Sequence, residues 1–336
     1  MHYSRLIVFI LGCLWVAGCT KYTPPGRPQP YLGPTESMAD VVAQINRNTA
    51  PLRTLWARHS FEATVVDERG KSFFVNGDGN LLFRKPRELR LIGNKDIAGT
   101  IFEAGSTDDR FWLKVLPEAD TMWWGYHVNV GKPCALDVPI RPDALVEVLG
   151  ISDIDQTFST EPQPVMRFNN DSDAYMFLWT QPSGSRRVPV REVWYDRATK
   201  LPKLVLFFDT EGRVVVRAYL AKHAPVQIDS STPAPRRSEA ADRLAEDPQL
   251  RSGVAQSPRV TPDSARVTPD SPRVTPDSPR VATDIKLLFP QTGTRMNLEL
   301  RDLMLQRNGV PNDRSIRFPT GDDVRTIIQI DKDCPQ

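Results

Sequence analysis

The sequence predicts a mainly β protein with a few helices, of the α+β class, whose antiparallel sheet is interrupted by a proline-rich insertion. Three observations support this prediction. Short apolar segments with a period of two alternate with turn residues through most of the chain. An amphipathic helical pattern precedes them. The 30 prolines are concentrated in particular stretches, and one of these contains a short repeat. A length of 336 residues allows one large domain or two small ones with an ordinary core.

The charge balance weakens two classes of function. Lys plus Arg is 43 and Asp plus Glu is 41, so the net charge is only +2. A nucleic-acid-binding protein needs a concentrated basic surface, which this balance does not suggest. Four His and four Cys leave little material for a metal centre or for thiol chemistry. We therefore expect no nucleic-acid partner, no metal and no cofactor.

Residues 1–18 have the features of a lipoprotein signal peptide. The apolar run Leu6–Val16 is about eleven residues long, too short to span a bilayer but typical of a signal peptide. It leads into Val16–Cys19 (VAGC), which matches the bacterial lipobox: an aliphatic residue, two small residues and a cysteine. The Cys19 thiol would be the lipid attachment site. The alternatives are an ordinary cleaved signal with an accidental cysteine, or an uncleaved anchor.

The resemblance to bacterial lipoproteins implies a mature chain that begins at Cys19, with fatty acyl groups such as palmitate anchored in a membrane. Cys13 would be discarded with the signal peptide. Thr20 is not the aspartate that often retains lipoproteins at the inner membrane. We therefore expect a location in the cell envelope, on the periplasmic face of the outer membrane rather than the inner membrane.

Residues 19–34 predict an extended tether, because five prolines fall between Lys21 and Pro34 with no apolar periodicity. Ser37 with Asp40 three residues later resembles a capping box at a helix start. The amphipathic pattern that follows is interrupted at Pro51 and comprises Met38, Val41, Val42, Ile45, Leu52, Leu55 and Trp56.

Residues 35–228 contain the first part of the predicted sheet domain. A second short helix is predicted at Pro142–Leu149, with Pro142 at its start and Gly150 after its end. The predicted strands are Phe61–Val66, Phe73–Asn76, Leu81–Arg84, Leu89–Ile92, Ile101–Ala104, Arg110–Leu116, Ala174–Thr180, Val190–Tyr195, Lys203–Asp209 and Val214–Leu220.

Residues 229–284 predict a disordered insertion, since they contain nine prolines and no aromatic residue. Four seven-residue units follow one another from Ser257, and two of them read SPRVTPD. A period of seven suggests a coiled coil, but a unit with up to two prolines and a single valine cannot form a helix interior. Strand patterns return in residues 285–336, at Ile285–Phe289, Met296–Leu305 and Val324–Ile330. We interpret them as the closing strands of the same domain.

These elements resemble the LolA/LolB superfamily of outer-membrane lipoprotein carriers and receptors. The resemblance rests on Leu81–Leu91 (LLFRKPRELRL), Ile101–Leu113 (IFEAGSTDDRFWL) and Thr326–Asp331 (TIIQID), and it covers most of Met38–Leu220 and Ile285–Asp331. It implies an open, curved antiparallel half-barrel with helices over the concave face, and an apolar groove for the acyl chains of lipoproteins or lipids. The lipid-anchored start is similar to the receptor-like branch, whereas the proline-rich insertion departs from the family.

No catalytic motif occurs in the sequence: there is no Gly-rich phosphate loop, Gly-x-Ser-x-Gly, HExxH or CxxC. His59, His127 and His223 lie far apart without ligand spacing, and we interpret them as satisfied or solvated side chains. Asp108–Asp109 and Asp322–Asp323 are adjacent pairs, whose side chains would point to opposite faces of a strand. We therefore expect no catalytic residue, and a protein that is not an enzyme.

Aromatic residues are the candidates for the ligand groove. They are Phe83, Trp112, Trp123 and Trp124, and the alternative is that they fill the core beneath a helix. Cys134 and Cys334 are the remaining thiols of the lipidated chain. An oxidising periplasm permits a disulfide between them, although the sequence does not give their distance.

The sequence thus predicts a lipid-anchored, non-enzymatic protein that binds acyl chains in an apolar groove, in lipoprotein sorting or envelope lipid handling. The alternative is a structural or interaction lipoprotein that contacts peptidoglycan or another envelope partner.

Overall fold

The computed structural model describes residues 30–66, 70–95, 98–116, 120–130, 132, 134–135, 142–227, 278–305 and 315–334. The predicted signal peptide, the lipid attachment site at Cys19, most of the tether and the repeats up to residue 277 lie outside the described residues.

The first described helix, α2 (Met38–Thr49), begins where its capping residue predicts. The Ser37 hydroxyl accepts a hydrogen bond from the Asp40 amide at 3.2 Å and donates to the Asp40 carboxylate at 2.6 Å. Val41, Val42 and Ile45 are fully buried on one face of the helix. Cap and apolar spacing together account for this helix.

The predicted helical pattern is wrong beyond Thr49. Leu55 and Trp56 belong instead to strand β1 (Thr54–Val66), where they pair with Phe83 and Leu82. Pro51 lacks the amide that a continuing helix needs, and the pairing with the next strand then determines the backbone conformation. The helical spacing of Leu55 and Trp56 relative to the residues of α2 is therefore a coincidence, because both residues belong to the alternating pattern of β1.

Most of the described chain lies in β-strands, which confirms the predicted mainly β class with few helices. The helices after α2 are a 3₁₀ turn, η1 (His127–Asn129), and α3 (Pro142–Val148). The strands after β1 are β2 (Ser72–Arg84), β3 (Glu88–Lys95), β4 (Gly99–Ser106), β5 (Arg110–Val115), β6 (Thr121–Tyr126), β7 (Pro164–Asn169), β8 (Ala174–Ser183), β9 (Arg186–Asp196), β10 (Pro202–Phe208), β11 (Val214–Pro225), β12 (Arg280–Phe289), β13 (Thr294–Met304) and β14 (Thr326–Gln329).

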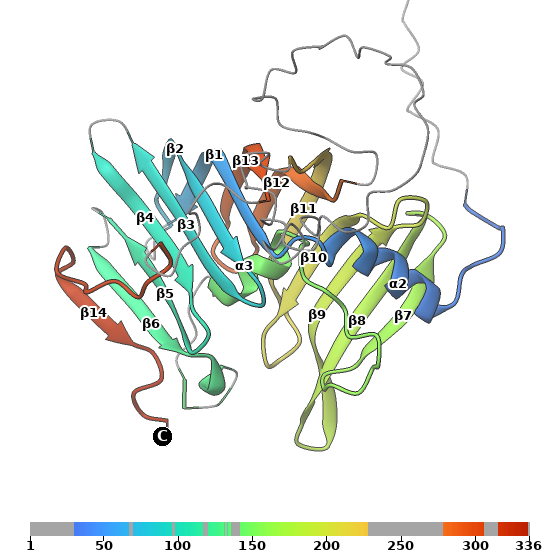
Figure 1. Cartoon of the computed structure of the whole chain (residues 1–336). Coiled ribbons are helices and arrows are strands. Elements are labelled where there is room, and N and C mark those ends of the chain that lie inside the picture. The colour runs from blue at the N-terminus through green and yellow to red at the C-terminus, as the bar shows by residue number, and fades with distance from the viewer. Residues whose placement is uncertain are drawn as a thin grey trace, which may run out of the picture.

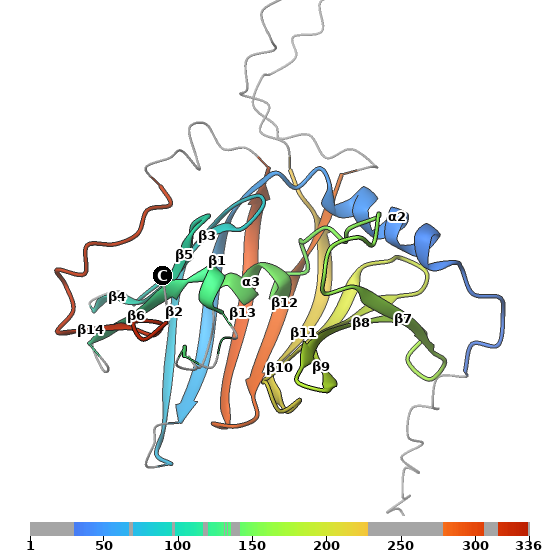
Figure 2. The ribbon, with the colours of Figure 1, turned by 90° about the horizontal axis from the view of Figure 1, so that it is seen from below.

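Within the described residues these strands form one sheet of fourteen strands, in the order β14-β6-β5-β4-β3-β2-β1-β13-β12-β11-β10-β9-β8-β7. Neighbouring strands are antiparallel, except that β14 runs parallel to β6. The sheet curves around α3 and stays open, with β14 and β7 at its two ends (Figures 1 and 2). The curvature gives the sheet an inner and an outer face.

The strands that follow the insertion lie in the middle of the sheet. β12 pairs with β11, and β13 pairs with β1, so residues 280–304 join the two halves of the earlier chain. The last residue of β11, Pro225, lies opposite the first of β12, Arg280. The chain therefore leaves and re-enters the sheet at the same end of two neighbouring strands, and even a long connection between them adds only a logarithmic entropy cost.

The predicted boundary of the insertion at residue 284 is wrong. The fourth repeat unit, Ser278–Asp284, contributes most of its residues to β12, and Val281 and Ala282 are 1% exposed. This unit reads SPRVATD, so Thr283 replaces the second proline of the SPRVTPD units. Without that proline the unit can supply the amide that a strand ladder needs.

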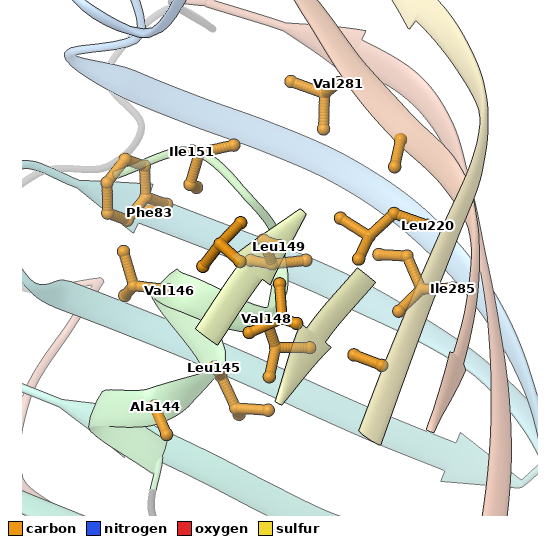
Figure 3. Packing of buried hydrophobic residues seen from close by; sticks show 14 of the residues in the cluster. Phe83, Ala144, Leu145, Val146, Val148, Leu149, Ile151, Leu220, Val281 and Ile285 are labelled. Carbon is orange, nitrogen blue, oxygen red and sulfur yellow. The ribbon is translucent and has the colours of Figure 1, made fainter. Parts of the chain in front are cut away.

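The main hydrophobic core lies on the inner face, between the sheet and the helices α2 and α3. Figure 3 shows part of this core. Leu145 and Val148 of α3, and Leu149 directly after the helix, lie beside Leu220 of β11 and Ile285 of β12. A second, smaller cluster contains Leu82, Trp112, Met122 and Ile316. It lies on the outer face, beneath the segment 315–325.

Candidate functional site

The candidate functional site is an apolar cavity of about 730 Å³ on the inner face of the sheet. Its size falls within the range of small-molecule sites, roughly 300–1,000 Å³. The lining comes from strands β1–β6, β12 and β13, from the β12–β13 turn, from α3 and from Leu149, which directly follows α3. The lining residues include Phe61, Phe73, Val75, Leu81, Leu91, Phe102, Ala104, Leu113, Trp123, Leu145, Val148, Leu149, Ile285, Leu287, Met296 and Leu298.

Strand alternation builds the walls of this cavity. In β5, Leu113 and Val115 face the cavity, whereas the alternating residues Trp112 and Lys114 face outward. In β2, Phe73, Val75 and Leu81 line the cavity in the same way. An apolar residue at every second position of several neighbouring strands thus produces a continuous hydrophobic surface.

Helix α3 closes the inner end of the cavity. It packs against β3, β4 and β5, and its Leu145 and Val148 line the space together with Leu149. On another face of the helix, Glu147 forms an ion pair with Arg191 of β9. The Arg191 guanidinium carbon lies 3.9 Å from the centre of the Trp179 ring. The ion pair therefore connects α3 to the far half of the sheet, where the cation–π contact holds Arg191 against β8.

The cavity opens toward the ends of the long hairpins. Leu81 and Leu298 are buried near α3, whereas Phe73, Val75 and Met296 are half-exposed farther along the same strands. β1, β2, β12 and β13 extend beyond their neighbours in Figure 2. Exposure thus increases along the walls, which locates the mouth at these hairpin ends.

The lining contains no ionisable side chain among the described residues. Its polar side chains are Gln291, Thr292 and Thr294, all at the β12–β13 turn near the mouth. Each already bonds within the protein. Gln291 donates to Asp209 at 3.2 Å, Thr292 accepts from the Thr294 amide at 3.2 Å, and Thr294 accepts from the Val66 amide at 3.2 Å. The cavity therefore offers hydrophobic contact, with no charge inside.

The structure places the tryptophan candidates on two different faces. Trp123 lines the cavity. Trp112 and Trp124 do not, so their assignment to the groove is wrong: they are cross-strand partners on the outer face, where the Phe318 ring packs on both. The register of β5 on β6 decides this, since it pairs Trp123 with Leu113 instead.

Phe83 is also wrongly assigned to the groove. It lies on the inner face of β2, two residues after the cavity residue Leu81, but it does not line the cavity. Its ring is fully buried, and Figure 3 shows it on the side of α3 where Val146 and Ile151 lie. Phe83 is therefore a core residue behind the inner end of the cavity.

A charged cluster missed by the sequence analysis lies on the outer face. Glu103 is 4% exposed and accepts from Arg90 at 3.0 Å and from the Trp112 indole at 3.2 Å. Lys114 donates to Asp323 at 2.7 Å and lies 3.7 Å from Glu103. The hydrogen bond from Lys114 lowers the pKa of Asp323. These contacts attach the segment 315–325 to the sheet, which is a structural role. Lys114 lies between the apolar residues Leu113 and Val115, and it shares a strand face with Trp112. A charged residue on that face was the sequence signal that Trp112 points outward.

His59 is a buried histidine with one unsatisfied nitrogen, which differs from the satisfied or solvated side chain that the sequence suggested. It is 2% exposed, and its Nε2 lies 2.9 Å from the Ile92 carbonyl across β2. The approach requires Gly79, because a Cβ there would lie 2.7 Å from that nitrogen. Nδ1 has no partner among the described residues. Burial lowers the pKa of His59 to about 4.

Cys134 and Cys334 form a disulfide, with Cα atoms 5.1 Å apart. The surrounding hydrogen bonds hold the same two segments together. The buried Asp331 carboxylate accepts from the Asn129 amide at 2.8 Å and from the backbone of Tyr126 at 2.9 Å. The disulfide therefore joins the C-terminal segment after β14 to the loop that follows β6 and η1.

The described residues contain no group of three or more His, Cys, Asp and Glu side chains that could hold a metal ion. In the described part of the chain, every helix is too short or too polar to cross a bilayer.

No protein-family model and no curated protein matches the sequence. Solved structures do match. A LolA superfamily protein from Nitrosomonas europaea has 9% identity and a TM-score of 0.45, over 84% of this chain and 99% of that one. A DUF1329 family protein from Desulfovibrio piger has 10% identity and a TM-score of 0.45, over 83% and 97%. A putative outer membrane lipoprotein-sorting protein domain from Vibrio parahaemolyticus has 11% identity and a TM-score of 0.42, over 83% and 95%.

Proposed function

We propose that this protein is a non-enzymatic binding protein that holds acyl chains of lipids or lipoproteins in the inner-face cavity. One observation carries the proposal: the cavity of about 730 Å³ is lined by apolar side chains, with no ionisable group among them. Hydrocarbon is the ligand chemistry that such a surface favours, because a buried unpaired charge is costly there.

The free energy available from this surface is sufficient for capture. Each methylene removed from water contributes about 0.8 kcal/mol, so ten buried methylenes contribute roughly 8 kcal/mol. That corresponds to a dissociation constant of about 1 μM before the cost of ordering the chain is subtracted. No chemical step is needed, since equilibrium capture follows from hydrophobic burial.

Movement of α3 provides a route by which access could be controlled. Its Leu145 and Val148 form the inner end of the cavity, while the Glu147–Arg191 ion pair connects it to β9. Both side chains of this pair are partly exposed, at 28% and 19%. Water weakens such a pair, so we expect the ion pair itself to add only a modest free energy to the cost of separating α3 from β9.

We further propose that lipidated Cys19 anchors the domain to the outer membrane, facing the periplasm, so that the cavity serves lipoprotein sorting or envelope lipid handling. The support for this placement is the lipobox Val16–Cys19 in the sequence.

Quenching of Trp123 fluorescence tests the cavity. A fatty acyl chain that carries bromine atoms quenches a tryptophan that it touches, and Trp123 lines the cavity. We expect the purified protein to lose fluorescence when the brominated lipid is added. The Trp123→Phe variant should show much less quenching, because its cavity tryptophan is absent.

Trp124→Phe is the matched control. It removes the adjacent tryptophan, whose side chain packs on Phe318 at the outer face, so the quenching should persist. Equal quenching in wild type and Trp123→Phe would contradict binding at this cavity. Absence of any bound lipid after purification, together with absence of quenching, would favour the structural or interaction function instead.

A further inference from the structure

We infer that the outer face of strands β7–β12 docks on a membrane surface that contains anionic phospholipids. This contact is separate from the inner-face cavity. It rests on the proposed function only for the lipid anchor at Cys19, which brings a membrane within reach of the sheet. The support consists of an apolar patch on this face, the unpaired cations beside that patch, and the point at which the chain enters the sheet.

The patch consists of six apolar side chains on the outer face of four neighbouring strands, β8–β11. Their direct neighbours along these strands, such as Phe177, Val193 and Val205, are buried on the inner face, so alternation turns the six outward. They are half-buried or exposed, and in the described chain none of them is part of either hydrophobic cluster. Strand pairing places them in two adjacent rows: Met176, Trp194, Leu204 and Tyr219 in the first, and Leu178 and Leu206 in the second.

The composition of the patch suits the boundary between water and lipid. Trp194 and Tyr219 each combine a large ring with a polar group, and these two residue types are enriched where a bilayer meets water. The Trp194 indole donates a hydrogen bond to the Glu192 carboxylate, which lies between the rows. A continuous apolar patch on a soluble domain typically marks an interaction surface. We therefore expect this face to have a partner.

The charges around the patch favour an anionic partner. Four basic side chains lie on the same outer face beside the rows: Arg167, Arg217, Lys286 and Arg295. Arg167 pairs with Met176 at one end of the first row, and Lys286 pairs with Tyr219 at the other end. None of the four forms an ion pair with another described residue. A second copy of the chain on this face would bring like charges together, whereas anionic lipid head groups would neutralise them.

The chain enters the sheet at its β7 end, which limits the distance between this face and the proposed anchor. Tyr31 packs on Phe168 of β7 with ring centres 5.8 Å apart, and the Arg197 guanidinium carbon lies 3.7 Å from the centre of the Tyr31 ring. Figure 1 shows the first described residues beside β7. Cys19 and Tyr31 are twelve residues apart, so they lie at most about 43 Å from each other. A lipidated Cys19 would therefore hold this end of the sheet near the bilayer, where proximity strengthens even a weak surface contact.

Vesicle binding by the unanchored chain tests the docking face, because a lipid anchor would hold every variant on the vesicle. The chain used is residues 19–336 with Cys19→Ala, which contains every described residue. Its partition is measured by cosedimentation with vesicles of phosphatidylethanolamine and phosphatidylglycerol. Each cation near an anionic surface contributes about fivefold to binding, so the Arg167→Gln, Arg217→Gln double variant should bind about 25-fold more weakly. The Arg47→Gln, Arg53→Gln control removes the same charge from exposed positions in and near α2, and it should bind like the parent chain.

Brominated vesicle lipids test the apolar rows. All these proteins carry Trp123→Phe, which removes the tryptophan that a lipid in the cavity could quench. We expect the vesicles to quench the remaining fluorescence. Adding Trp194→Phe should remove much of this quenching. Adding Trp124→Phe instead should preserve it, because Trp124 packs on Phe318 in the other half of the sheet.

An absence of vesicle binding at high lipid concentration would overturn the inference, as would equal binding by the two charge variants. Equal quenching after Trp194→Phe and Trp124→Phe would overturn it as well. A dimer in sedimentation that Leu204→Ser disrupts, without vesicle binding, would assign the patch to a second copy of the chain. These results leave the proposed function intact, because quenching of Trp123 by a fatty acid needs no vesicle and acylation of Cys19 is measured by labelling. A failure of those two measurements would contradict the proposed function instead.

Discussion

Removal of the disulfide should destabilise the whole sheet. The bond joins residues that are 200 apart in sequence and closes most of the described chain into one loop. In the chain-entropy account, a loop of this size restricts the unfolded chain by about 5 kcal/mol, and measured effects are typically 2–4 kcal/mol. We expect the Cys134→Ser, Cys334→Ser double variant to lose roughly 3–5 kcal/mol. For a chain of this size, that corresponds to a decrease in melting temperature of about 10 °C.

The assay is thermal unfolding followed by circular dichroism, with and without a dithiol reductant. The wild type should melt lower after reduction, whereas the double variant should melt at that same lower temperature under both conditions. The reductant therefore serves as an internal control for the serine substitutions. A wild type that melts at one temperature in both conditions would refute the reasoning, as would two titratable thiols in the unreduced, denatured protein.

Three further predictions concern the anchor, the buried histidine and the insertion. Cys19→Ala should abolish incorporation of a fatty-acid analogue in metabolic labelling, because no other residue can form the thioether; label retained by the variant would contradict the lipobox. Burial holds the folded pKa of His59 near 4, below its ordinary value of 6.5. The unfolded state therefore binds the proton first, and stability that is complete above pH 6.5 should fall by up to about 3 kcal/mol as the pH approaches 4. Urea unfolding of His59→Gln should lack this contribution, and an unchanged pH dependence would refute it. Deletion of residues 257–277 should leave the melting temperature within about 2 °C of the wild type. Extending the deletion to residue 283 should lower it, because Val281 and Ala282 pack in the core; equal melting of both deletions would contradict the strand boundary.

The sequence by itself determined the class of the fold and the residues of most strands. Alternating apolar residues form strands wherever one face is buried, so the pattern at Arg110–Leu116 became β5 (Arg110–Val115). The capping residue Ser37 and the proline at Pro142 marked the starts of α2 and α3 because these signals act within one turn of the chain. Local rules of this kind need no knowledge of distant residues.

Strand β7 (Pro164–Asn169) escaped prediction, although it forms one end of the sheet. Its exposed residues include Val165, and its buried face is limited, so its apolar alternation is weak. An edge strand with a neighbour on one side alone carries less of the pattern that reveals central strands.

Only the tertiary structure decided which residues line the cavity. Alternation predicts that Trp123 and Trp124 face opposite ways, but the direction toward the cavity depends on which way the sheet curves. Trp112 joined Trp124 on the outer face because the register of two strands brought them opposite each other. Register and curvature arise from contacts between residues far apart in the chain, such as those of β13 with β1. For the same reason, the proximity of Cys134 and Cys334 could not be read from the sequence: 200 residues separate them, and the folded sheet brings them within 5.1 Å.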